Sequence, residues 1–409
     1  MKAKRVMLCL FLLGIITISL TGCWNARELR NLAFVLAMGI DRSPKTNEYK
    51  VSFQVVIPGS VATGITGGGG ITTPVAVYTG KGNTLFSAIR NASKKVPRQL
   101  FFAHLQLVVI GEELAKHGIQ DLFDFFERSK EPRLTTMVLV ARGSEAKPII
   151  STLTTLEKIP ANSITGKIKM SSILLSENFR IEIYEVLRGL VNQGEPLING
   201  VKLTGDPDKG MVKSNVEQTI RAADVIIQGM AIFKNGKLKG WLDNGEARGT
   251  TWILNKMKST IVELDCKKKK NSIGVEIIRS LTELHVETKN GEPIIHIHVK
   301  EEGNLSEVQC PIDLSSVSVI GDLENEWEIK TESEVMSAVK AAQNEKSDFL
   351  GFGDAVNRAN PKLWEKIKKD WSEKFSTCEV DVKVDAYIRR SGMRLKPYMS
   401  EQQQKEKRQ

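Results

Sequence analysis

The chain has 409 residues, of which 41% are hydrophobic and 6% aromatic, and 58 Lys and Arg against 48 Asp and Glu give it a formal net charge of +10. This length suffices for two or three domains with hydrophobic cores. The basic excess suits an anionic membrane surface, whereas the low aromatic content and the lack of a nucleic-acid-binding motif argue against a nucleic-acid partner.

A basic and then apolar leader opens the chain. Lys2, Lys4 and Arg5 precede residues 6–20, which carry no charge, are too few to span roughly 30 Å of hydrocarbon, and are typical of a signal-peptide core. The leader ends in Leu20-Thr21-Gly22-Cys23, which resembles the bacterial lipobox at all four positions. We therefore expect residues 1–22 to be a lipoprotein signal peptide and Cys23 to be the lipidation site, with diacylglycerol on sulfur and an acyl chain such as palmitate on the new amine. An ordinary signal peptide with a chance cysteine is the alternative.

The segment that follows Cys23 is short and polar. Apolar alternation begins at Leu32, and seven extended residues reach only about 25 Å, so the first domain should lie close to the bilayer. Two or more acyl chains make a stable anchor. No second apolar run approaches the roughly 18 residues of a membrane-spanning helix.

Three cysteines remain in the body of the chain, at positions 266, 310 and 378. An odd number allows at most one internal disulfide, and none of the three has the spacing of a metal site. We interpret Cys266, Cys310 and Cys378 as small buried apolar side chains, and whether any two of them pair stays open.

The first half of the chain predicts a sheet covered by helices. Period-two alternation indicates strands at 32–38 and 49–55, which read as an antiparallel pair. Gly80-Lys81-Gly82 lacks the third glycine of a dinucleotide-binding loop and favours a tight turn. The remaining elements are a flexible loop at 58–74, strands at 75–79, 105–110 and 134–141, and helices from Asn83, at 112–128 and near 183–191.

Residues 206–218 lack periodicity and contain Asp206-Pro207-Asp208, which favours a linker there. We therefore expect an N-terminal domain at 23–205, a C-terminal domain at 219–395 and a polar tail at 396–409. The second half predicts an antiparallel sheet with helices grouped to one side, so the fold class is α+β, or mixed α/β. Its expected strands are 224–233, 238–242, 259–266, 273–280, 281–288, 293–300 and 380–388, with helices ending near 254, at 328–344 and from Asn360-Pro361.

One hairpin brings potential metal ligands together. A two-residue Asn290-Gly291 turn would place His285 opposite His296 and Glu283 opposite His298, on one face of the hairpin. The other face is apolar, so we interpret the histidine face as the solvated side of an amphipathic hairpin, with a zinc site as the alternative.

No motif in the sequence indicates catalysis. A nucleophile elbow, an HExxH motif, a Walker loop and a paired-carboxylate signature are all missing, and His104 and His117 stand alone. We expect no enzyme activity, no cofactor and no metal site, and we interpret His104 as a structural residue at the start of a strand.

The chain resembles the Ger(x)C family, the C-subunit lipoproteins of GerA-type spore germinant receptors, over nearly its full length. Gly22-Cys23-Trp24-Asn25-Ala26-Arg27-Glu28-Leu29 is similar to the family's start, with Asn25 in place of the usual Asp. The other blocks, in order, are Gly39-Ile40-Asp41, Phe102-Ala103-His104, Ile110 to Gly118, Glu131-Pro132-Arg133, Gly229 to Lys234, Lys237 to Leu242, Asp348-Phe349-Leu350-Gly351-Phe352-Gly353-Asp354, Pro361, Trp364 and Trp371. Each block alone is weak, but their shared order is specific.

The resemblance implies a non-enzymatic subunit anchored on the outer, extracytoplasmic face of the spore inner membrane. It implies assembly with integral-membrane A and B subunits in a receptor for nutrient germinants. The family's germinant pocket is assigned to the permease-like B subunit, so no pocket residues carry over to this chain. The alternative is a lipoprotein solute-binding protein of a membrane transporter, which needs two doubly wound lobes; the Asn-Gly hairpins and consecutive strands after residue 224 argue against it.

Overall fold

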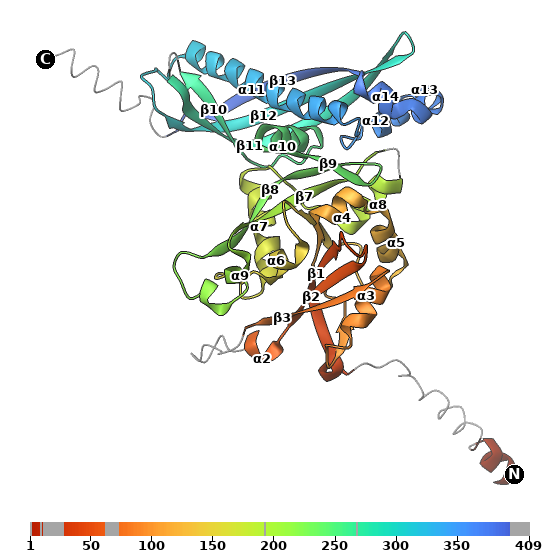
Figure 1. Ribbon diagram of the computed structural model, residues 1–409. Coiled ribbons are helices and arrows are strands. Elements are labelled where there is room, and N and C mark those ends of the chain that lie inside the picture. Colours follow the sequence, from red (N-terminus) through yellow and green to blue (C-terminus); the bar gives the residue numbers. More distant parts are fainter. Residues whose placement is uncertain are drawn as a thin grey trace.

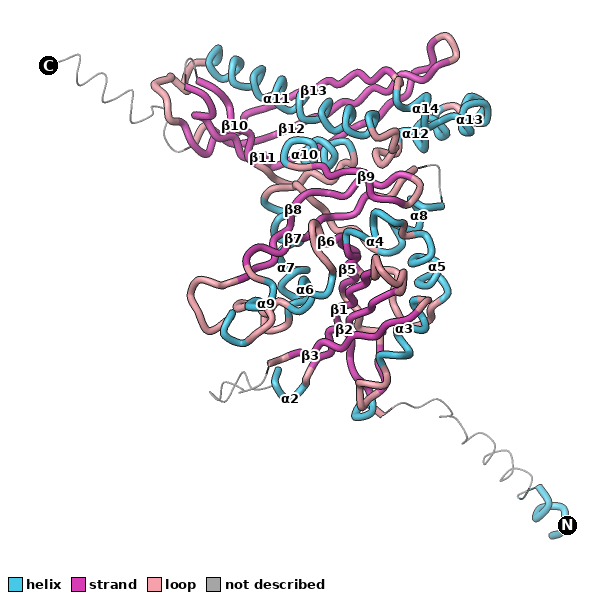
Figure 2. Tube along the Cα trace, viewed as in Figure 1, coloured by secondary structure: helices cyan, strands magenta, loops and turns pink. Residues whose placement is uncertain are grey.

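The computed structural model describes residues 2–8, 10, 28–61, 73–191, 194–266 and 269–392. Two β-sheets, one above the other in Figures 1 and 2, organise these residues into an elongated body. Both carry packed helices, so the α+β class predicted from the sequence is confirmed. The lipobox and Cys23 lie outside the described residues.

The first sheet is mixed. Its core strands β1, β5, β6 and β7 are parallel, and antiparallel strands flank them on both sides. The order is β3-β2-β1-β5-β6-β7-β8-β9, and short β4 pairs in parallel with the start of β1. The strands are β1 (Leu32–Arg42), β2 (Tyr49–Val56), β3 (Val75–Gly82), β4 (Gln99–Phe101), β5 (Leu107–Gly111), β6 (Met137–Ala141), β7 (Leu197–Gly205), β8 (Ala223–Lys234) and β9 (Lys237–Leu242).

Helices cover both faces of this sheet, because successive side chains of a strand point to opposite faces. In β5, Val108 and Ile110 face one hydrophobic core while Leu107 and Val109 face the other. The first core is closed by α3 (Leu85–Ala92), α4 (Glu112–His117), α5 (Gln120–Arg128) and α8 (Ile183–Val191), and the second by α6 (Ala146–Ser151) and α7 (Pro160–Leu174). Short pieces complete this unit: η1 (Leu29–Asn31), α2 (Pro58–Val61), α9 (Pro207–Gly210) and η2 (Lys213–Asn215).

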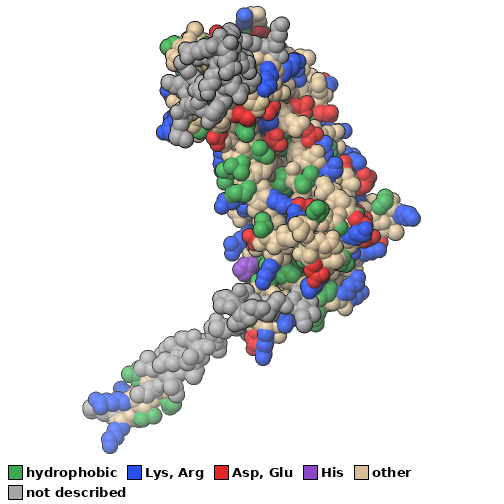
Figure 3. All heavy atoms as spheres, turned by 90° about the vertical axis from the view of Figure 1, so that its left-hand side faces the viewer, with side chains coloured by type: hydrophobic (Ala, Val, Ile, Leu, Met, Phe, Trp, Pro, Cys, Tyr) green, Lys and Arg blue, Asp and Glu red, His purple; other side chains and the backbone are tan. Residues whose placement is uncertain are grey.

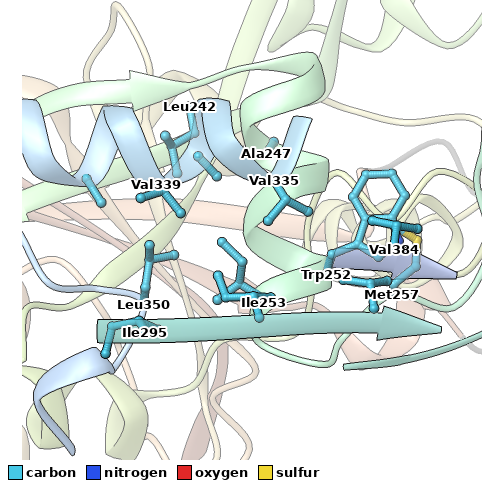
Figure 4. Packing of buried hydrophobic residues seen from close by; sticks show 14 of the residues in the cluster. Leu242, Ala247, Trp252, Ile253, Met257, Ile295, Val335, Val339, Leu350 and Val384 are labelled. Carbon is cyan, nitrogen blue, oxygen red and sulfur yellow. The ribbon is translucent and has the colours of Figure 1, made fainter. Parts of the chain in front are cut away.

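The second sheet has four long strands, in the order β10-β11-β12-β13. Its helices lie against one face, and Figure 4 shows side chains of α10 and α11 pointing toward one another beside Ile295 of β12. The elements are β10 (Ile261–Cys266), β11 (Lys269–Lys289), β12 (Glu292–Val308), β13 (Glu379–Arg390), α10 (Asn244–Ile253), α11 (Val317–Asn344), α12 (Phe352–Ala359), α13 (Pro361–Ile367), η3 (Lys368–Asp370) and α14 (Trp371–Ser376).

The two units share a core where β7, β8 and β9 meet the second sheet's helices. Leu197, Met230, Ile232 and Leu242 of the first sheet are buried in the same hydrophobic cluster as Trp252 and the second sheet. Figure 3, a view from the side, shows a continuous surface across this junction with charged and scattered hydrophobic side chains. The units are therefore joined by buried apolar contacts.

Polar contacts reinforce the junction. Arg142, just after β6, makes a bidentate ion pair with Asp243 at 2.5 and 2.8 Å, and its guanidinium lies 4.8 Å from the Trp241 ring centroid. The buried Ser347 hydroxyl donates to the Phe233 carbonyl oxygen at 2.6 Å. The Arg142–Asp243 pair ties the end of β6 to the end of β9, and the Ser347 bond holds the segment after α11 against the β8–β9 hairpin.

Several predicted elements are confirmed. The β1–β2 antiparallel pair, the helix near 183–191 and the Asn235-Gly236 hairpin are present. Asn235 and Gly236 both have positive φ, as a type I′ turn requires. The Asn360 side chain accepts a hydrogen bond from the Leu363 backbone N–H and caps α13, as its Asn-Pro start indicated.

Other predictions about single elements were wrong. The expected helix at 112–128 is two helices, because Gly118 adopts φ 140° between α4 and α5. The strands expected at 273–280 and 281–288 are one strand, β11, and β13 pairs with β12 in parallel, so the second sheet is not purely antiparallel. Thr84, not Asn83, caps α3. Strand β4, strand β7 and helix α7 had no counterpart in the predictions.

The two glycines of Gly80-Lys81-Gly82 lie at the end of β3, not in a turn. A Cβ atom at Gly80 would lie 2.1 Å from the Ala88 carbonyl oxygen, and one at Gly82 would lie 2.2 Å from Ser87 Oγ. The glycines therefore let α3 approach β3 closely, which gives this Gly-x-Gly pattern a role in packing.

The segment 206–218, expected to link two domains, connects β7 to β8 within one sheet. The change from the first sheet to the second falls after Leu242. In the loop expected at 58–74, residues 58–61 form α2, and 62–72 lie outside the described residues.

Candidate functional site

The described body begins at Glu28, five residues after Cys23. η1 leads into β1, and Leu32 of β1 pairs with Gln99 of β4. Figure 1 places this entry at the end of the molecule farthest from the second sheet. No helix among the described residues is both long and apolar enough to cross a membrane.

His104 lies in the turn before β5, beside this entry. Its ring centroid is 5.6 Å from that of Phe34 and 5.9 Å from that of Phe101, and the His104 side chain is exposed. Phe34 and Phe101 are themselves partners in the β1–β4 pairing. The three rings form a small aromatic cluster, so His104 packs locally, although it precedes β5 instead of starting it.

The β11–β12 hairpin has the register predicted from the sequence. His285 lies opposite His296 and Glu283 opposite His298. His296 contacts Asp381 and Glu287 at 3.2 and 3.3 Å, and His298 contacts Asp385 at 2.6 Å. Carboxylates of β11 (Glu287) and of the neighbouring strand β13 (Asp381 and Asp385) thus contact ring nitrogens of these two histidines. The described residues contain no group of three or more His, Cys, Asp or Glu side chains arranged to hold a metal ion.

Two of the three body cysteines form a disulfide. Cys266 at the end of β10 pairs with Cys310, just beyond β12, and their Cα atoms are 6.4 Å apart. The interpretation of all three as apolar thiols is therefore wrong for this pair. Cys378 is a free, half-buried thiol, and burial raises its pKa to about 12. That thiol is a poor nucleophile at neutral pH because its thiolate form is scarce.

Asp348 lies in the block Asp348 to Asp354 and lines a cavity of about 340 Å³ at the junction, together with Trp371, Lys234 and Glu195. Its carboxylate accepts hydrogen bonds from Phe352 N at 2.9 Å, Gly353 N at 2.7 Å and Trp371 Nε1 at 2.8 Å. Burial raises the pKa of Asp348. All of its close partners are structural, so this acid fixes the start of α12 against α14.

Other residues that carry the family resemblance also hold the fold. A Cβ atom at Gly353 would lie 2.8 Å from both Trp364 and Trp371, so only glycine fits between these rings. Asp41 accepts from the backbone N–H groups of Ala146 and Lys147 at 2.7 and 3.3 Å and caps α6, and burial raises its pKa to about 6. Sequence reasoning found these residues by resemblance but had no signal for their contacts.

These observations define a class: an α+β protein of two sheets joined by a shared core, in which the described motif residues serve the fold. Comparison with known proteins supplies the family. Residues 25–203 match the family described as "Spore germination protein N-terminal domain", and residues 228–392 match "Spore germination B3/ GerAC like, C-terminal". The chain belongs to this family of spore germination proteins, and the resemblance recognised in the sequence is confirmed.

Similar proteins cover almost the whole chain. "Spore germination protein KC" of Bacillus subtilis (strain 168) is 38% identical over 402 residues, which are 97% of this chain and 98% of that protein. "Spore germination protein B3" of the same organism is 27% identical, over 90% of this chain and 93% of its own length. The solved "Crystal Structure of the GerBC protein" matches with a TM-score of 0.55 and 22% identity, over 89% of this chain and all of that one, and shares its fold.

Proposed function

We propose that this chain is the lipid-anchored, non-enzymatic C subunit of a nutrient germinant receptor. It sits on the extracytoplasmic face of the spore inner membrane and assembles there with integral-membrane A and B subunits. The observation that carries this proposal is the match of two family models, to residues 25–203 and 228–392, the first of which begins two residues after the cysteine of a lipobox-like pattern.

The arrangement of the motif residues supports a scaffolding role. Asp41, Asp348 and Gly353 each hold one secondary-structure element against another. The second sheet has the order β10-β11-β12-β13, which differs from the doubly wound lobes that a transporter's solute-binding protein uses. The second unit therefore lacks the architecture that the transporter alternative requires of both lobes.

Detergent-solubilised spore membranes from a strain with a tagged chain provide the test. Two polytopic membrane proteins should co-purify with the wild-type chain, and Cys23→Ala should move the chain out of the membrane fraction and slow nutrient germination severely. Cys378→Ala is the matched control, since it removes a half-buried thiol just before β13 of the second sheet and should change neither property. Recovery of the chain alone with a tightly bound small solute would instead favour the transporter reading.

A further inference from the structure

One edge of the first sheet gathers three segments around the point where the chain arrives from Cys23. Strands β1, β5 and β6 are parallel, so the residues that precede them lie at the same edge. Backbone bonds join the residue before β5 to the strands on both sides, because Gln106 N donates to Leu36 O of β1 at 2.9 Å and Met137 N of β6 donates to Gln106 O at 3.0 Å. The three segments are residues 28–31, 93–106 and 129–136.

This edge is strongly basic. Its segments contain six exposed cationic side chains against two acidic ones, Glu28 and Glu131, for a net charge of +4. At the opposite edge, the segments that follow the same strands, 43–48, 112–119 and 142–145, contain three cationic and four acidic side chains, for a net charge of −1. We name the six cationic residues the basic rim: Arg30, Lys94, Lys95, Arg98, Lys130 and Arg133.

Most of the basic rim has no acidic partner. The side chains of Lys94, Arg98, Lys130 and Arg133 make no hydrogen bond or ion pair with any described residue. Lys95 donates to the Thr79 carbonyl oxygen at 2.8 Å, and Arg30 pairs with Glu28. Elsewhere in the fold, cations such as Arg142 and Arg248 lie in bidentate pairs. Four unpaired cations on one edge mark a surface suited to external anions.

Apolar side chains lie among these cations. Leu29 is 72% exposed and Leu134 is 44% exposed, and both lie within the three segments. The half-buried rings of Phe34 and Phe101 lie against each other, with their centroids 5.8 Å apart. Exposed leucines and aromatic rings interleaved with lysine and arginine are typical of surfaces that enter the headgroup layer of a membrane.

We propose that the basic rim rests on the anionic headgroups of the bilayer that holds Cys23 and so fixes the orientation of the whole body. The inference rests on the lipid anchor of the proposed function. Five residues from Cys23 to Glu28 reach at most about 17 Å, so the rim lies within close reach of the membrane surface. The second sheet, at the far end in Figure 1, then points away from the bilayer.

A fluorophore on Leu134→Cys tests this orientation. The lipidated full chain is reconstituted into vesicles of phosphatidylcholine with about one third phosphatidylglycerol, and quenching by spin-labelled lipid is measured. Both labelled variants also carry Cys378→Ala, which removes the free thiol found among the described residues. A label on Val317→Cys, at an 87% exposed site in α11, reports the far end. Quenching of the label at position 134 should be at least about twice the quenching of the label at position 317.

Two charge-matched variants separate the basic rim from net charge. The rim variant combines Lys94→Gln, Arg98→Gln, Lys130→Gln and Arg133→Gln, and should lose the excess quenching at position 134. The excess should also be absent when the unaltered rim is tested on vesicles of phosphatidylcholine alone. The control variant also replaces two lysines and two arginines, at exposed, unpaired sites of the second unit, and should keep the excess quenching. It combines Lys340→Gln, Arg358→Gln, Lys362→Gln and Arg390→Gln.

The outcomes also separate the basic rim from the anchor. If the chain floats with vesicles but shows no excess quenching at position 134, or shows the same excess in the rim variant, the proposal for the basic rim is wrong. The proposed lipid anchor is then unaffected. A chain that fails to float with vesicles overturns both. At about 1 M salt, where the screening length is ~3 Å, the chain should still float while the excess quenching disappears.

Discussion

Glu301 is a buried acid whose protonation is coupled to the stability of the fold. Its side chain is fully buried between β12, α10 and α11, where Trp252 Nε1 and Thr331 Oγ1 donate hydrogen bonds to the two carboxylate oxygens, the latter at 2.9 Å. Burial raises the pKa of Glu301 to about 7, although these hydrogen bonds partly offset that rise. The ionised form is thus disfavoured in the folded protein relative to the unfolded chain.

We predict that this residue makes the protein less stable as the pH rises from about 4.5 to about 7. In that range folded Glu301 keeps its proton while the unfolded chain loses it, so the folded state binds more protons and each rise in pH favours unfolding. The stabilisation is complete below pH 4.5 and lost above pH 7, a difference of about 3 kcal/mol. Chemical denaturation of the wild type and Glu301→Gln at pH 5 and pH 8 measures it.

The Glu301→Gln variant should show a shallower pH dependence and gain stability at pH 8, because the neutral amide can still accept from Trp252. Asp41, whose pKa burial raises to about 6, contributes with the same sign in both proteins and cancels in the comparison. Equal pH slopes for wild type and variant would contradict the assignment to Glu301.

The disulfide is a covalent constraint on the second sheet. Cys266 and Cys310 are 44 residues apart and join the end of β10 to the end of β12 around the whole β11–β12 hairpin. Removing the bond with Cys266→Ala and Cys310→Ala should destabilise the second sheet by about 3–4 kcal/mol, because the unfolded chain regains the entropy of an open loop. Thermal unfolding with and without reductant measures this. Cys378→Ala, which leaves the disulfide intact, should leave the sensitivity to reductant unchanged.

The close crossing of α10 and α11 depends on one glycine. A Cβ atom at Gly249 would lie 2.1 Å from the Glu334 carbonyl oxygen and 3.0 Å from Ala338 Cβ. Gly249→Ala should therefore force the two helices apart and destabilise the fold by about 2–4 kcal/mol.

Gly321→Ala is a matched control on the longer helix. Gly321 lies within α11, where an added Cβ would meet nothing within 4 Å. Alanine there should be neutral or stabilise by roughly 0.5–1 kcal/mol through helix propensity. Denaturant midpoints of the two variants measure the two changes in stability. Similar changes at both sites would show that backbone contact does not limit how closely α10 and α11 approach.

At the scale of the whole molecule, sequence patterns predicted what is local and missed what is distant. Asn235-Gly236 and Asn360-Pro361 encode a turn and a helix start within a few residues, so both were predicted correctly. The parallel pairing of β13 with β12 and the Cys266–Cys310 bond depend on residues brought together only by folding. No spacing rule could have selected one pair among three cysteines.

The same distinction between local and distant residues applies to the proposed lipidation site and the basic rim. The proposed lipidation signal is linear, since Leu20-Thr21-Gly22-Cys23 resembles a lipobox residue by residue. The basic rim is scattered over three segments, from Arg30 to Arg133, and becomes one surface only through the parallel order of β1, β5 and β6. The placement of 206–218 as a linker failed to anticipate that β7 and β8 pair across it, since β7 carried no recognised strand pattern.

The shared core makes a prediction about the whole molecule: the two sheets should unfold together. Met230 of β8 is fully buried in the cluster that also contains Trp252, Ile295 and Val335 of the second unit. Met230→Ala should destabilise by about 2–4 kcal/mol because it leaves a cavity at the junction. Hydrogen exchange in β5 and in β12 measures the response of each sheet. If unfolding is cooperative, protection should fall equally in both strands, since each opens only when the junction does. A fall in β12 alone would mean that the second sheet opens independently, with β7–β9 remaining folded on the first.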